Sequence, residues 1–109
     1  MDAPEKAFEK AAKKMADSQK AYINAHMEVM KNEQARVMAQ AKMTNSMAQV
    51  AIDPSKIGVY TQAVQKYSQL TAKIGMLRAK EVKSEVDFQK SVKDFQKAAD
   101  AFQKAKKKK

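Results

Sequence analysis

The proline at position 54 is the residue that most restricts what this chain can form. On either side of it lie about fifty residues with almost no other helix breaker, since the chain holds 2 prolines and 2 glycines in all. Proline lacks a backbone N–H and clashes with the preceding turn, so it is rare inside a helix. The preceding residue, Asp53, is pushed out of the helical conformation. We predict one helix over about residues 4–52 and another over about 54–104, joined by a turn that contains Asp53, Pro54 and Gly58.

The composition of the chain limits it to one small domain. It has 109 residues, no Trp, and a hydrophobic content of 44% to which Ala and Met contribute much. Small domains bury a modest fraction of their surface, and a two-helix layer buries less than a compact bundle of the same length. We therefore expect a single helical hairpin over residues 1–105 and a Lys-rich tail over 106–109, with apolar faces that need partner chains.

Several classes of protein are disfavoured by the sequence. Without Cys the chain has no disulfides and no thiolate metal sites. It has no run near the ~20 apolar residues needed to span a bilayer. The residues after Met1 do not form the apolar segment of a secretory signal. We expect a protein that is cytoplasmic or leaves the cell by a route that needs no signal peptide.

The first half begins with a helix start signal and continues with a seven-residue repeat. Asp2 and Glu5 flank Pro4 at the spacing of a capping box. The repeat then consists of Phe8, Met15, Tyr22 and Val29, with Ala12, Gln19 and His26 at the intermediate positions. Such a repeat is the seam of a coiled coil. Beyond Met30 the pattern is less regular.

The second half has a longer repeat of the same kind. Its members are Tyr60, Tyr67, Ile74, Glu81, Phe88, Phe95 and Phe102, accompanied by Ala63, Leu70 and Leu77. Ser55 is the expected cap of this helix. Gly75 lies in its interior at a cost of roughly 1 kcal/mol relative to Ala, and is expected to let a neighbour pack closely.

Folding the chain at Pro54 brings the two repeats together. Phe8 then meets Phe102, Tyr22 meets Phe88, and Met38 faces Leu70. The predicted fold is all-α, an extended antiparallel two-helix hairpin that resembles a coiled coil. The predicted hairpin core consists of Phe8, Met15, Tyr22, Tyr60, Tyr67, Leu70, Ile74, Phe88, Val92, Phe95 and Phe102.

The chain offers little for catalysis. His26 is its one histidine, and zinc requires three or four converging ligands. No Gly-rich loop is present to hold a phosphate, and most carboxylates neighbour lysines, as on a solvated helix face. We predict a protein that is not an enzyme, with no catalytic residues, cofactor or metal.

Two groups of residues are candidates for binding partners. Methionine suits adaptable interfaces, and a predicted subunit interface comprises Met27, Met30, Met38, Met43 and Met47. The formal net charge is +10, and a predicted polyanion contact comprises Lys104, Lys106, Lys107, Lys108 and Lys109. A homo-oligomer or filament is the expected partnership. Nucleic acid is a weaker alternative, because acids are interspersed among the bases.

The region from Ile52 to Gln96 resembles the small needle and inner-rod subunits of bacterial type III secretion systems. Asp53-Pro54 is followed by Tyr60 and Tyr67, and the stretch later contains Val82-Lys83, Val86-Asp87 and Phe95, similar to that family's pattern. The resemblance implies helical hairpins that stack into a hollow tube and conduct unfolded cargo. It also implies that the second helix approaches the lumen and that the turn at Pro54 faces outward.

The sequence is also compatible with two other functions. One is a soluble basic hairpin that binds an acidic partner, either nucleic acid or protein. The other is a small coiled-coil adaptor or chaperone of fixed oligomeric state. Phosphate binding weakens steeply with salt whereas apolar packing does not, so salt dependence separates the first of these from a filament.

Overall fold

A computed structural model describes residues 3–107 and confirms the all-α hairpin. Helix α1 spans Ala3–Ile52, a short 3₁₀ helix η1 spans Pro54–Lys56, and helix α2 spans Ile57–Lys107. The described part of the chain contains no strand. The predicted helix-start residue Asp2 lies outside the described residues, as do Lys108 and Lys109 of the predicted polyanion contact.

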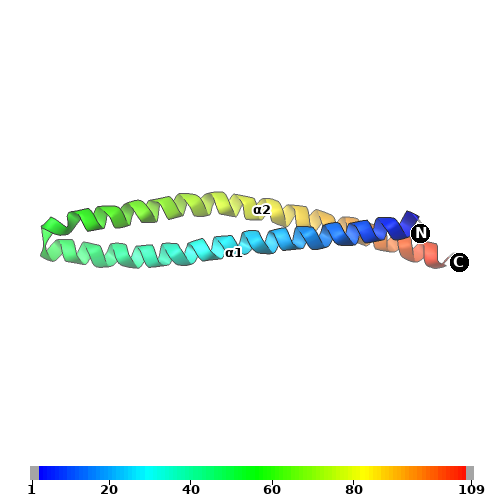
Figure 1. Cartoon of the computed structure of the whole chain (residues 1–109), viewed down its shortest axis with the longest axis horizontal. Helices are drawn as coiled ribbons and strands as arrows, with labels where there is room; N and C mark the ends of the chain where they lie inside the picture. The colour runs from blue at the N-terminus through cyan, green and yellow to red at the C-terminus, as the bar shows by residue number, and fades with distance from the viewer. Residues whose placement is uncertain (1–2, 108–109) are drawn as a thin grey trace. The chain divides into compact units, whose positions relative to one another are not determined.

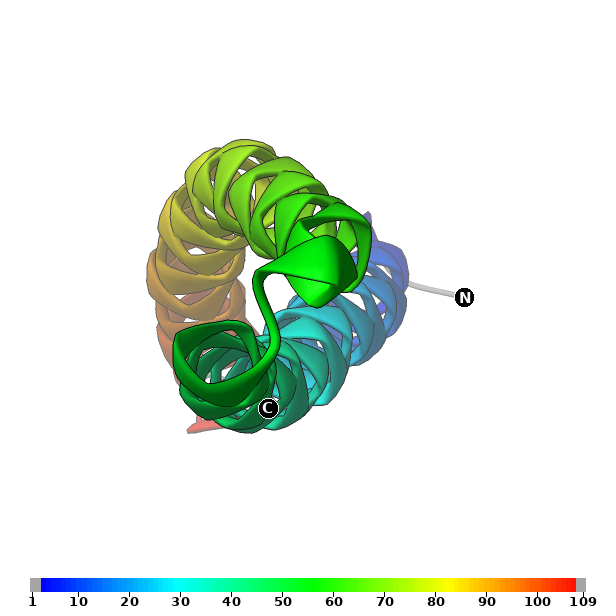
Figure 2. The ribbon, with the colours of Figure 1, turned by 90° about the vertical axis from the view of Figure 1, so that its left-hand side faces the viewer.

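The turn is built around Asp53. Figure 2 shows the ribbon from the end where α1 passes into α2. Asp53 has the extended backbone expected before a proline, with φ −136° and ψ 97°. Its carboxylate Oδ1 accepts hydrogen bonds from the Ser55 backbone N–H at 3.1 Å and from the Ser55 hydroxyl at 2.7 Å. Its own N–H donates to the Gln49 carbonyl at 2.8 Å, which closes α1. One residue therefore ends the first helix and caps the next element.

Three details of the predicted second helix are wrong. The α-helix begins at Ile57 rather than at residue 54, because Pro54 first opens a 3₁₀ turn that Asp53, and not Ser55, caps. Gly58 belongs to the first turn of α2 and has no left-handed backbone, so the chain reverses without it. Helix α2 continues to Lys107, because its last turn is rich in lysines that complement the helix dipole.

The hairpin divides into two compact units. Unit 2 comprises residues 26–79, and Figure 1 shows its α1 and α2 segments side by side, running in opposite directions from the turn. Unit 1 is formed by the start of α1 and the end of α2, which among the described residues are 3–25 and 80–107. Each unit is a pair of packed helix segments, so each buries residues along one seam.

On each helix one row of covered residues follows a heptad, with spacings of three and four in alternation. On α1 this row consists of Phe8, Ala11, Met15, Ser18, Tyr22 and Ala25 in unit 1, then Val29, Asn32, Arg36, Ala39, Met43, Ser46 and Val50 in unit 2. On α2 it consists of Tyr60, Ala63, Tyr67, Leu70, Ile74 and Leu77 in unit 2, then Glu81, Ser84, Phe88, Ser91, Phe95, Ala98, Phe102 and Ala105 in unit 1. We call these positions the seam. Further half-buried residues flank the two rows, and they are Pro4, Glu5, Ala12, Glu33, Ala35, Val64, Glu85, Val92 and Ala99.

The seam corrects the predicted pattern of α1 in two respects. Gln19 and His26 are exposed, and the small residues Ser18 and Ala25 occupy the intermediate positions instead. The repeat also continues past Met30 without a break, although several of its members are polar or small. Met38, expected to face Leu70, is 74% exposed and lies off the seam.

Burial along the seam is shallow. The buried apolar residues are Ala25, Val29, Ala39, Ala63 and Ile74, and no large side chain among those described is fully buried. All eleven residues of the predicted hairpin core lie at the seam or beside it. Of these, Ile74 is buried and the other ten are half-buried.

The turn gives a first prediction. Asp53→Ala removes the acceptor for both Ser55 donors and should lower the free energy of unfolding by about 1 kcal/mol. Asp53→Asn keeps a side-chain oxygen at this position and should lose less. Urea unfolding followed by circular dichroism measures the difference. Equal stability of Asp53→Ala and the wild type would contradict the capping role.

Candidate interaction surfaces

An aromatic cluster holds the seam of unit 1. The ring of Phe8 on α1 lies 5.2 Å from that of Phe95 and 5.3 Å from that of Phe102, centroid to centroid. Tyr22 stacks on Phe88 at 6.2 Å with the rings 13° from parallel. The predicted pairings of Phe8 with Phe102 and of Tyr22 with Phe88 are thus confirmed. Aromatic pairs contribute about 0.5–1.5 kcal/mol beyond the area they bury.

The described part of the predicted polyanion contact lies at the end of α2. Lys104, Lys106 and Lys107 are exposed, and the ammonium of Lys106 lies 5.5 Å from the centroid of the Phe102 ring. A cation over an aromatic face at an exposed site contributes about 0.5–1 kcal/mol. Lys106 therefore has a structural partner within its own helix.

Polar residues interrupt the seam, and each is satisfied by its own helix. The amide of Asn32 donates to the Glu28 carbonyl at 2.8 Å, and the hydroxyl of Ser46 donates to the Lys42 carbonyl at 2.7 Å. In unit 1 the Ser91 hydroxyl donates to the Phe88 carbonyl at 2.7 Å. Within residues 3–107 no buried side-chain N or O lacks a hydrogen bond. These buried polar groups therefore cost little but do not tie one helix to the other.

An ion pair between Arg78 and Glu33 joins the helices of unit 2. The guanidinium of Arg78 on α2 donates to the carboxylate of Glu33 on α1. The Arg78 side chain is more than half exposed, and exposed pairs of this kind contribute about 0–1 kcal/mol. The pair favours the antiparallel register of this unit without fixing it.

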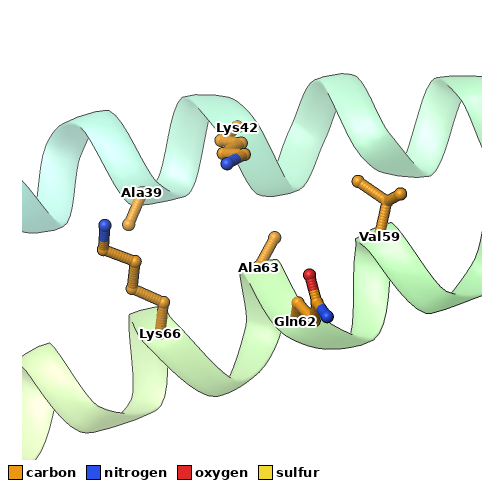
Figure 3. Close-up of a pocket in the computed structure, with 6 residues that line it drawn as sticks. All are labelled: Ala39, Lys42, Val59, Gln62, Ala63 and Lys66. Carbon is orange, nitrogen blue, oxygen red and sulfur yellow. The ribbon is translucent and has the colours of Figure 1, made fainter.

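A hollow opens where two alanines meet in the seam of unit 2. Ala39 and Ala63 point into the space between α1 and α2, and Lys66 reaches from α2 toward α1 (Figure 3). The hollow measures about 170 Å³, and Lys42, Val59 and Gln62 complete its lining. Beside it on α1 lies a wider groove of about 490 Å³ lined in part by Met38 and Asn45. The two small side chains leave this part of the seam incompletely filled.

The face of α1 that points away from the seam is long and uncharged. At about 100° per residue its members fall within an arc of about 100°, nearly opposite the seam positions of unit 2. We call it the outer α1 face; all of its members are exposed, and they are Met27, Met30, Gln34, Val37, Met38, Ala41, Asn45, Ala48 and Ile52.

Three of the predicted interface methionines lie on the outer α1 face, and two do not. Met27, Met30 and Met38 belong to it. Met43 is half-buried at a seam position, and Met47 is exposed on a different side of the helix. The heptad position of Met43 explains its burial, because it lies seven residues after Arg36 in the covered row.

A second uncharged row runs along α2, and the sequence analysis does not predict it. The outer α2 row consists of Ile57, Thr61, Val64, Ser68, Ala72, Gly75 and Ala79, all exposed except the half-buried Val64. These residues fall within an arc of about 80°, roughly 130° from the seam. They recur with the same spacing of three and four as the seam, which is the signal that could have identified them.

The described residues contain no cluster of side chains that could hold a metal ion. Between residues 3 and 107 no three His, Asp or Glu side chains gather closely enough to hold a metal ion. His26 is exposed on α1. The same stretch contains no helix that could cross a membrane.

Comparison of the chain with known protein families, curated proteins and solved structures found no match to any of them.

The aromatic cluster gives a second prediction. Phe8→Ala removes two ring contacts from a half-buried site and should lower the free energy of unfolding by about 2–3 kcal/mol, below the usual range for a filled core. Val86→Ala, at an exposed position of α2, should change it by less than about 0.5 kcal/mol. Chemical unfolding of the two variants provides the comparison, and similar losses in both would argue against the cluster.

The polar seam gives a third prediction. Asn32→Leu replaces a buried amide whose hydrogen bonds stay within α1, so no partner on α2 is left unsatisfied. We expect the free energy of unfolding to rise by about 1 kcal/mol, since apolar replacement of a buried polar group is often stabilising. Thermal unfolding measures the change. A marked loss of stability would show that Asn32 has an essential role across the seam.

Proposed function

We propose that this chain is a non-enzymatic structural subunit that assembles with copies of itself into a helical filament or tube. The observation that carries the proposal is the contrast between its two kinds of surface. The seam fully buries no large side chain among those described, whereas Met27, Val37 and Met38 are 62%, 65% and 74% exposed. Exposed apolar rows of this kind mark interaction sites.

The resemblance to type III secretion needle and inner-rod subunits supports a more specific form of this proposal. The residues that carry it, from Asp53-Pro54 to Phe95, lie on the turn and on α2. A tube of such subunits would conduct unfolded protein cargo out of a bacterial cell. Subunits exported by the apparatus they build need no cleaved signal, and other proteins of that apparatus would be further partners.

A basic hairpin that binds a polyanion is the second candidate. It is favoured by the exposed Lys104, Lys106 and Lys107, which lie together in the last turn of α2. Because Lys106 already lies over Phe102 and helix C-termini attract cations, these lysines also have a role in stabilising the helix. A coiled-coil adaptor of fixed oligomeric state is the third reading.

The proposal is tested by negative-stain electron microscopy of the purified chain over a range of protein and salt concentrations, with light scattering in parallel. We expect open-ended filaments or tubes that persist at high salt, because apolar packing does not depend on counterion release. Particles of one fixed size at every concentration would contradict the filament and favour the adaptor.

Replacing Lys104, Lys106 and Lys107 with Gln separates the filament from the polyanion-binding hairpin. The filament proposal predicts that this variant still assembles, since no apolar contact is removed. Fluorescence anisotropy with a labelled nucleic acid measures the alternative. Strong wild-type binding that is lost on the substitution or on adding salt would favour it.

A further inference from the structure

The hollow at Ala39 and Ala63 combines apolar residues with two lysines. We propose that it binds a small anion that carries a compact apolar group, such as an aromatic carboxylate. The apolar group lies against the two alanines, and the carboxylate lies between Lys42 and Lys66. All of these residues belong to unit 2 of one copy, so this inference goes beyond self-assembly and does not depend on it.

The space in the hollow comes from the small size of two facing seam residues. Ala39 on α1 and Ala63 on α2 are 7% and 5% exposed, and Val59 adds a third apolar side chain to the lining. The volume is about 170 Å³. An apolar cavity of about 150 Å³ is enough to bind benzene, whereas drug-sized ligands occupy roughly 300–1,000 Å³. The hollow therefore suits a group the size of a single aromatic ring.

Two lysines from different helices line this same hollow. Lys42 on α1 and Lys66 on α2 each follow one of the two alanines by three residues, so they hold equivalent positions beside the seam. Figure 3 shows Lys66 extending from α2 toward α1. Positions that flank a coiled-coil seam commonly hold opposite charges that pair across it. Arg78 and Glu33 pair in this way elsewhere in unit 2, but at the hollow both charges are positive.

Within residues 34–80 no carboxylate is placed to neutralise these two lysines. Neither Lys42 nor Lys66 has a charged residue three or four positions away on its own helix. The one acid in this range is Asp53, which lies about 16 Å from Lys42 along α1 and accepts hydrogen bonds from Ser55. Two like charges at one hollow repel each other and attract an anion. An anion bound between them removes this repulsion.

The lining offers contacts to both parts of such a ligand. The side-chain amide of Gln62 can donate to a carboxylate, as can the ammonium groups of Lys42 and Lys66. Hydrogen bonds between ions are stronger than those between neutral groups. Burial of the ring against Ala39 and Ala63 adds affinity that a simple inorganic anion lacks. We therefore expect the charge and the ring to be needed together.

Benzoate is the probe for this site, and two compounds that each lack one of its parts provide the comparison. Acetate keeps the carboxylate without the ring, and benzyl alcohol keeps the ring without the charge. The isotope-labelled full chain is titrated below its assembly concentration, and the NMR signals of the Ala39 and Ala63 backbone amides report binding. We expect a Kd of about 1 mM for benzoate and binding about tenfold weaker or less for the other two.

Filling the hollow should weaken benzoate binding. Ala63→Leu should weaken it about tenfold or more, because the added side chain takes the space of the ring. Its control Ala72→Leu, at an exposed position of α2, should leave the affinity within about twofold. Ala39→Val repeats the test from α1 in case Ala63→Leu disturbs folding, which circular dichroism checks.

Removing one cation should also weaken binding. Lys66→Gln should reduce the affinity for benzoate about fivefold, since one charged partner of the carboxylate is lost. Its control Lys73→Gln replaces an exposed lysine of the same helix that does not line the hollow, and should leave the affinity unchanged.

Charge reversal tests the lysine pair without any ligand. Lys66→Glu places a carboxylate opposite Lys42 and should raise the midpoint of thermal unfolding by about 3 °C, while benzoate binding is lost. Lys73→Glu is the matched control, because Lys73 likewise has no charged residue three or four positions away. It should shift the midpoint by less than about 1 °C. An unchanged midpoint in Lys66→Glu would contradict the repulsion between the lysines.

The ligand series can overturn the proposal in several ways. Acetate that binds as tightly as benzoate would reveal a contact for simple anions only, and benzyl alcohol that does so would leave the lysines without a role. Benzoate binding that survives both Ala63→Leu and Lys66→Gln would lie elsewhere on the chain. The absence of any saturable signal change would exclude the site. Each of these results leaves self-assembly untouched, because that is judged from the wild type alone.

Discussion

Two helices packed against each other can each cover only one face, and this limit governs the whole molecule. The seam positions recur every three and four residues along α1 and α2, yet most of their side chains stay half-buried. Even the stacked rings of Phe8 and Phe102 keep contact with solvent. Stability therefore comes from many shallow contacts distributed along the helices rather than from a central core.

The turn and the aromatic register could be predicted because each depends on strong local physics. Proline at position 54 excludes a continuous helix, and folding there leaves Phe8 only the aromatics near the end of α2 as partners. The exact start of α2 could not be predicted, since Asp53 and Ser55 are both good caps. Only the observed hydrogen bonds show that the Asp53 carboxylate is the acceptor.

The middle of α1 was harder to predict because its large apolar residues do not coincide with the seam positions. Met38 is apolar and was expected in the contact, but Ala39 occupies the seam position. Asn32 and Ser46 lie in the seam although they are polar, since each hydrogen bonds to its own helix. A prediction based on large apolar residues identifies the aromatic rings of unit 1. It does not identify seam positions that are occupied by small residues or by polar residues that hydrogen bond within their own helix.

The polar residues of the seam hydrogen bond within their own helices, and this affects how the two helices can separate. The side chains of Asn32, Ser46 and Ser91 all donate hydrogen bonds to backbone carbonyls of their own helix. Between the helices of unit 2, the exposed side chain of Arg78 pairs with Glu33. Separating the helices therefore breaks none of these three hydrogen bonds, and Asn32, Ser46 and Ser91 keep their partners. Such a hairpin can unzip progressively from either end of its seam, and can re-pair with an identical chain by the contacts it has just released.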